Sequence, residues 1–156
     1  MGKLGLIFLL LFLQSSVDAK NVIFKSYYPW ESDSVLVAWV IHNYVDSNIK
    51  FISFEKKKER IGKDNSINTA DSKLRRTARF TAFEMALKYY EVEGDACTDQ
   101  LKKLIRVLEM MPWKKQEFEE FVSFEDGFIP SFPQNIGDAD LSKSFSYIDS
   151  YCKKKK

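Results

Sequence analysis

Residues 32–46, with the sequence SDSVLVAWVIHNYVD, constrain the fold more than any other segment of this chain. Ser32, Asp33 and Ser34 are residue types that favour the start of a helix. The apolar side chains that follow cover most sides of that helix and are not confined to one stripe. A helix with this pattern has to be enclosed by the rest of the domain, so we expect it to lie inside the hydrophobic core.

The composition fits one hydrophobic core and one domain. The chain has 156 residues, of which 45% are hydrophobic and 15% aromatic, and a chain of this length usually forms a single domain. Its 24 basic and 22 acidic residues give a net charge of +2, without the basic excess that is typical of nucleic-acid-binding proteins. We expect a single globular domain over residues 20–156 and no nucleic-acid partner.

The first 19 residues have the pattern of a cleavable secretory signal peptide. Lys3 precedes the apolar run LGLIFLLLFL, and Val17 and Ala19 occupy the small-residue positions of a cleavage site. The run is about half the roughly 20 residues that span a bilayer, which argues against an uncleaved anchor. We expect cleavage after Ala19 and a periplasmic protein with no stable membrane span, in a compartment where disulfides persist.

Apolar periodicity predicts the remaining elements. Strands are predicted for the β-branched and aromatic residues 48–54 and, from period-two alternation, for 79–91, although that segment also holds good helix formers. Amphipathic patterns predict helices over 97–111, 114–124 and 138–152, the last with Asp138 or Asp140 as N-cap. The charged and polar sequence of residues 55–73 predicts an exposed loop or frayed helix, and the prolines and glycines of residues 126–138 predict a loop. The predicted fold is a mostly helical α+β domain with a small antiparallel sheet.

Two cysteines, Cys97 and Cys152, are the main candidates for chemistry. Each extends the apolar stripe of a predicted helix, so both are expected to face the core. Three interpretations follow: a single disulfide, two buried free thiols, or a reactive or metal-binding pair, which lacks the close CxxC spacing typical of such sites. His42 is the only histidine, which excludes a cluster of histidines as metal ligands and makes it the sole candidate base for a cysteine nucleophile.

Several segments, in the same order along the chain, resemble the chromate-resistance exported proteins, a family whose domain also occurs at the C-terminus of chromate-responsive regulators. The resemblance covers about residues 30–153 and begins with DSVLVAWVIHNYVD and NIKF. Later segments that resemble the family are AFE, GDAC and the terminal FSYIDSYC. The matching positions are Asp33, Trp39, Ile41, Asp46, Phe51, Phe83, Gly94, Asp95, Cys97 and Cys152, with Glu84 in place of the family's aspartate.

This chain departs from the family pattern at positions that could carry chemistry. Val37 replaces a cysteine, Val92 and Glu93 replace a histidine pair, and Gln100 replaces an acidic residue. The segment NIGDAD also lacks the histidine that the family has there. The resemblance, with these losses, implies a non-catalytic accessory or binding module for an oxyanion or metal, with no identified cofactor.

Two other functions stay open from the sequence. One is a thiol-dependent redox or metal-binding enzyme that uses Cys97 and Cys152. The other is weak contact with an anionic envelope surface through the terminal lysines, which are Lys153, Lys154, Lys155 and Lys156.

Overall fold

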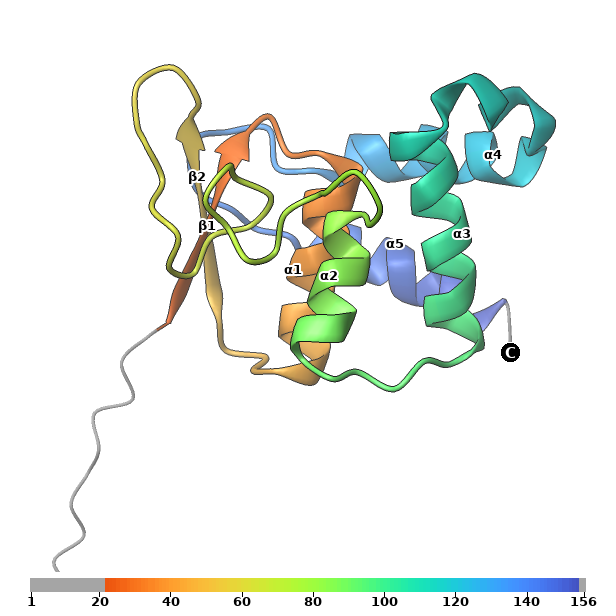
Figure 1. The fold of residues 1–156 in the computed structure, drawn as a ribbon, viewed down its shortest axis with the longest axis horizontal. Coiled ribbons are helices and arrows are strands. Elements are labelled where there is room, and N and C mark those ends of the chain that lie inside the picture. The colour runs from red at the N-terminus through yellow and green to blue at the C-terminus, as the bar shows by residue number, and fades with distance from the viewer. Residues whose placement is uncertain (1–21, 155–156) are drawn as a thin grey trace, which may run out of the picture.

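The structure is a computed structural model that describes residues 22–154 and confirms a mostly helical α+β domain (Figure 1). Its elements in chain order are β1 (Ile23–Tyr28), α1 (Ser32–Tyr44), β2 (Lys50–Glu55), α2 (Ala82–Tyr89), α3 (Ala96–Met110), the 3-10 helix η1 (Pro112–Glu117), α4 (Glu119–Phe128), the 3-10 helix η2 (Ile129–Ser131), β3 (Gly137–Asp138) and α5 (Ser142–Lys153).

Helix α1 is enclosed by the rest of the domain, as its sequence predicts. Every residue from Ser32 to Ile41 is buried. In Figure 1 the sheet lies to the left of α1, α2 lies against it, and α3 and α5 lie to its right. The core is therefore built around α1, and the helices and strands that follow it in sequence are positioned against its sides.

The sheet is mixed and has the order β1-β2-β3. Strand β2 confirms the prediction for 48–54, but its long partner is β1, which runs parallel to it from Ile23 to Tyr28. Parallel strands joined by α1 form a β-α-β unit, a connection that buries the intervening helix against the sheet. The only antiparallel pairing among the described strands is the short one between β2 and β3.

The predicted strand over 79–91 is wrong, because this segment contains helix α2. Thr81 is its N-cap and forms a capping box with Glu84, in which each side chain bonds the other residue's backbone N–H. The buried residues Ala82, Phe83, Ala86 and Leu87 form one helical face. Capping and helix propensity together prevail over the period-two alternation, so the small sheet is completed by β1 and β3.

The second half of the chain follows the predictions more closely. Helix α3 is confirmed, and α5 buries the predicted stripe of Leu141, Phe145, Ile148 and Cys152. Neither Asp138 nor Asp140 is the N-cap of α5, since that position is Leu141. The helix predicted at 114–124 is divided between η1 and α4, and α4 extends into the predicted loop. No helix within residues 22–154 is long and apolar enough to cross a membrane.

Candidate functional site

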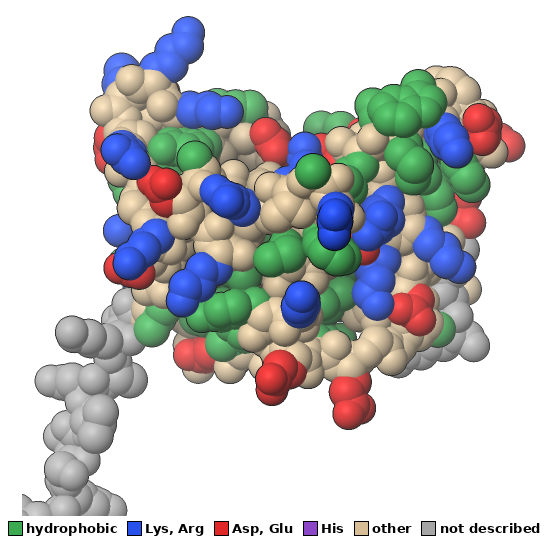
Figure 2. Space-filling view, in the orientation of Figure 1, with side chains coloured by type: hydrophobic (Ala, Val, Ile, Leu, Met, Phe, Trp, Pro, Cys, Tyr) green, Lys and Arg blue, Asp and Glu red, His purple; other side chains and the backbone are tan. Residues whose placement is uncertain are grey.

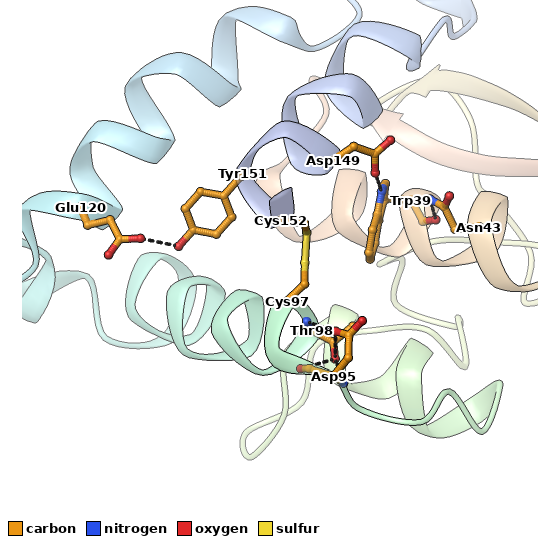
Figure 3. The surroundings of a disulfide bond; sticks show 9 residues. All are labelled: Trp39, Asn43, Asp95, Cys97, Thr98, Glu120, Asp149, Tyr151 and Cys152. Atoms are coloured by element: carbon orange, nitrogen blue, oxygen red, sulfur yellow. Dashed lines mark hydrogen bonds between the residues drawn. A yellow bond between two sulfur atoms is a disulfide. The ribbon is translucent and has the colours of Figure 1, made fainter. Parts of the chain in front are cut away.

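The residues singled out from the sequence do not form one site. Asp33, Phe83 and Glu84 lie where α1 meets α2, and Gly94, Asp95, Cys97 and Cys152 lie where α3 begins beside the end of α5. Trp39 points from α1 towards Asp149 of α5 (Figure 3). Asp46 lies in the turn after α1, where its carboxylate accepts a hydrogen bond from the backbone N–H of Asn48 at 2.8 Å.

Cys97 and Cys152 form a disulfide between the first turn of α3 and the last turn of α5 (Figure 3). Their Cα atoms are 5.0 Å apart, within the range of about 4.4 to 6.8 Å that disulfides require. The two residues are only 5% and 8% exposed. Asp95 caps α3 directly before the bridge by accepting a hydrogen bond from the backbone N–H of Thr98 at 2.7 Å. The bridged form has no thiol available for metal or redox chemistry.

The carboxylate of Asp33 caps a helix other than its own. It is fully buried and accepts hydrogen bonds from the backbone N–H groups of Ala82 and Phe83, each at 2.8 Å. These two groups are in the first turn of α2, where a helix has no partners of its own for its N–H groups. The guanidinium of Arg76 donates to the same carboxylate at 3.2 Å and to Glu109 of α3 at 2.6 Å. Asp33 therefore joins α1, α2 and, through Arg76, α3.

The two carboxyl groups that accept hydrogen bonds from Arg76 have raised pKa values. For Asp33, burial outweighs the two backbone hydrogen bonds and the charge of Arg76, and the net effect raises its pKa above the ordinary 3.8. For Glu109, burial again outweighs Arg76 and raises the pKa above the ordinary 4.5. A separate ion pair, Arg106 with Glu84 at 2.7 Å, links α2 to α3 nearby. These side chains have partners within the fold, which supports a structural role for this part of the family-like pattern.

A cleft of about 590 Å³ opens between β2, the segment 138–142 and α5, and His42 near the end of α1 also lines it. One wall is aromatic: the rings of His42 and Phe145 lie 4.9 Å apart, and Phe51 packs edge-on against Phe145 at 6.1 Å. Its polar side chains include Lys50 and three carboxylates, which are Asp138, Asp140 and Asp149. The cleft therefore combines an aromatic wall with charged groups.

The cleft carries an excess of negative charge. Its three carboxylates against Lys50 give a net formal charge of −2 when His42 is neutral. Hydrogen bonds from the side chain and backbone N–H of Ser142 lower the pKa of Asp140, so this carboxylate is ionised at neutral pH. Within residues 22–154, no three His, Cys, Asp or Glu side chains are grouped so that they could hold a metal ion. The arrangement therefore favours a ligand with positive charge and an apolar or aromatic-facing part.

Trp39 links the sequence prediction to the cleft. Its indole N–H donates a hydrogen bond of 2.9 Å to Asp149, which lines the cleft from α5. Phe51, another family-like position, lines the cleft itself, and so does His42. Asp138 and Asp140 were predicted only as helix caps, and Lys50 and Asp149 were not predicted. Apolar periodicity and motif spacing do not predict these residues as parts of one site, because the cleft brings together segments that are about 100 residues apart in sequence.

No family model, no curated protein and no solved structure matches this chain.

Proposed function

We propose that this chain is an exported, non-catalytic binding module of the chromate-resistance type, whose cleft binds a small organic cation. The observation that carries the proposal is the excess of carboxylates beside the aromatic wall of one cleft of about 590 Å³. Ligand sites are typically concave, roughly 300 to 1,000 Å³ in volume, and combine apolar walls with a few convergent polar groups. The cleft has each of these properties.

The charge of the cleft decides the proposed ligand class. The family resemblance implies an oxyanion or a metal, but an oxyanion would face three carboxylates and a single lysine. A unit charge about 4 Å from a carboxylate gains or loses roughly 1 kcal/mol even in water. An ammonium group gains this energy, and the aromatic rings in the wall of the cleft favour it further through cation–π contact.

The alternative, a thiol-dependent enzyme, requires the bridge between Cys97 and Cys152 to be opened first. Both cysteines are buried in the bridged form, and His42 lines the cleft, whose lining includes neither of them. The contacts of the two cysteines support a structural bridge more directly than a reaction.

Binding of the primary and quaternary ammonium probes cadaverine and choline tests the proposed ligand class. We expect saturable binding by calorimetry, weakened about fivefold by Asp149→Asn, because removing one carboxylate costs roughly 1 kcal/mol. Lys50→Gln should strengthen binding by a similar factor, since it removes the one lysine of the cleft. Both side chains are exposed, and the Oδ1 of an asparagine at position 149 can still accept the hydrogen bond from Trp39, so the fold should be unaffected.

Glu117→Gln is the matched control, because it removes one exposed carboxylate from η1, outside the cleft. This variant should bind both ammonium probes as the unmodified protein does. The proposal fails if neither probe binds at millimolar concentration, or if sulfate binds more tightly than both.

Export is proposed on the N-terminal sequence, with the disulfide as support, because such bridges persist mainly in oxidising compartments. When the full chain is produced in a bacterium, we expect the exported protein to begin at Lys20 by intact-mass measurement. Leu10→Arg, which places a charge in the apolar run, should leave the protein uncleaved in the cytosol. Full-length, unprocessed protein in the cytosol from the unmodified sequence would contradict export.

A further inference from the structure

The loop between β2 and α2 concentrates positive charge on one part of the surface. Residues 56–79 contain nine basic and three acidic residues, a net formal charge of +6, whereas the whole chain carries only +2. The other residues together therefore carry −4. Figure 2 shows Lys and Arg side chains across the face that carries this loop, where they extend beyond the loop towards α3. Such an asymmetry is not needed to solubilise a domain whose total charge is small, and it creates a directed electrostatic field.

The loop is held in a defined position, so its charges form a fixed surface. Its apolar residues Ile61, Ile67 and Leu74 are buried. Its backbone pairs with β1 through two 2.8 Å hydrogen bonds, from Lys25 N–H to the Asn65 carbonyl and from Ile67 N–H to the Lys25 carbonyl. Eight of the nine basic side chains are exposed: Lys56, Lys57, Lys58, Arg60, Lys63, Lys73, Arg75 and Arg79.

Most of these exposed cations have no acidic partner within the described part of the chain. Lys58 pairs with Glu55, and Arg60 pairs with Asp71. Within residues 22–154, no carboxylate lies within ion-pair distance of the five cations Lys56, Lys57, Lys63, Lys73 and Arg79. Their charge is therefore available to an external anionic surface.

Exposed aromatic rings border the same surface. Phe80, directly after the loop, is 40% exposed, and Tyr89 at the end of α2 is 51% exposed. Lys88 and Arg106 lie 6.0 Å from the Phe80 ring centre, and Lys73 lies 5.6 Å from that of Tyr89. Cations beside exposed aromatic rings are typical of proteins that lie on the interface of a lipid bilayer, where rings enter the headgroup region.

We propose that residues 56–80 and the end of α2 form a docking surface for an anionic phospholipid membrane. This surface lies away from the end of α5, which carries Lys153, since the loop and the end of α5 are on opposite sides of the view in Figure 1. It is therefore a different contact from the one that the lysine tail predicts. The proposal is independent of the cleft, whose excess charge has the opposite sign.

Sedimentation with vesicles of 30% phosphatidylserine in phosphatidylcholine tests this surface. The variant Lys56→Gln/Lys57→Gln/Lys63→Gln/Arg79→Gln removes four exposed, unpaired charges. At about 1 kcal/mol per basic residue near the membrane, or roughly fivefold each, binding should fall by several hundredfold. Phe80→Ala should weaken binding a few-fold. This loss should be the same at high salt, because the contribution of the ring is apolar.

The charge-matched comparison is Lys114→Gln/Lys143→Gln/Lys153→Gln/Lys154→Gln, which removes the same charge from exposed positions on η1, α5 and the lysine tail, where the alternative contact would form. It should change binding less than fivefold, and circular dichroism should show that both variants stay folded. Equal loss in the two variants would overturn the proposal, as would equal binding to pure phosphatidylcholine vesicles. Tighter binding to single-stranded DNA than to the anionic vesicles would overturn the lipid as partner.

Discussion

Replacing both cysteines by serine is expected to lower the free energy of unfolding by about 4 kcal/mol, on the chain-entropy account of disulfides. Cys97 and Cys152 are 55 residues apart, so their bridge closes a long loop in the unfolded chain. The loop includes α3, α4 and most of α5. Urea unfolding of Cys97→Ser/Cys152→Ser, compared with the oxidised protein, measures the effect.

The reduced, unmodified protein is the control for this prediction, since it retains both sulfur atoms without the bond. It should unfold at nearly the same urea concentration as the double serine variant. A double variant within about 1 kcal/mol of the oxidised protein would contradict a stabilising bridge, because typical native disulfides contribute 2 kcal/mol or more.

The bridge also bears on the cleft, because α5 carries the cleft residues Phe145 and Asp149 and is fastened to α3 at its last turn. Trp39 holds Asp149 from α1 by one hydrogen bond. A helix fixed at its end and at one side chain keeps its lining residues in place without a ligand. A disulfide far from the ligand can therefore contribute to binding by reducing the disorder of the free site.

The parts of the fold that were predicted correctly have a local cause. Helices α1, α3 and α5 each carry an apolar pattern over three or more turns, and β2 is a short β-branched and aromatic run. In α2, the alternation of Phe83, Met85, Leu87 and Tyr89 was misleading, and the decisive signal was the capping box of Thr81 and Glu84. That signal is visible in the sequence as T-x-x-E.

Other features depend on contacts between distant segments, which periodicity does not encode. Asp33 was predicted to start α1, but its carboxylate bonds to α2, 49 and 50 residues away. The cleft likewise combines His42, Phe51 and Asp149 from three elements. The identity of the aromatic and acidic residues was available from the sequence, but their meeting in one cleft follows only from the packing around α1.

Asp33→Ala is expected to cost about 3 kcal/mol of folding free energy, because two buried backbone N–H groups lose their acceptor at roughly 1 to 3 kcal/mol each. These are the N–H groups of Ala82 and Phe83, and Arg76 loses one partner as well. Asp46→Ala is the matched control, since Asp46 belongs to the same family-like motif but makes only an exposed turn contact. It should cost less than about 1 kcal/mol in the same urea experiment, as is usual for surface substitutions.

The pH dependence of this cost gives a sharper test. Burial raises the folded-state pKa of Asp33, so the folded protein binds more protons than the unfolded chain just above the ordinary 3.8. The stabilisation that comes from the raised pKa of Asp33 is therefore fully present below pH 3.8, and it is lost as the pH rises through the raised pKa. The cost of Asp33→Ala should be largest near pH 4 and should decline towards pH 8. A cost that instead grows with pH would show that the hydrogen bonds and Arg76 outweigh burial, with the pKa of Asp33 below its ordinary value.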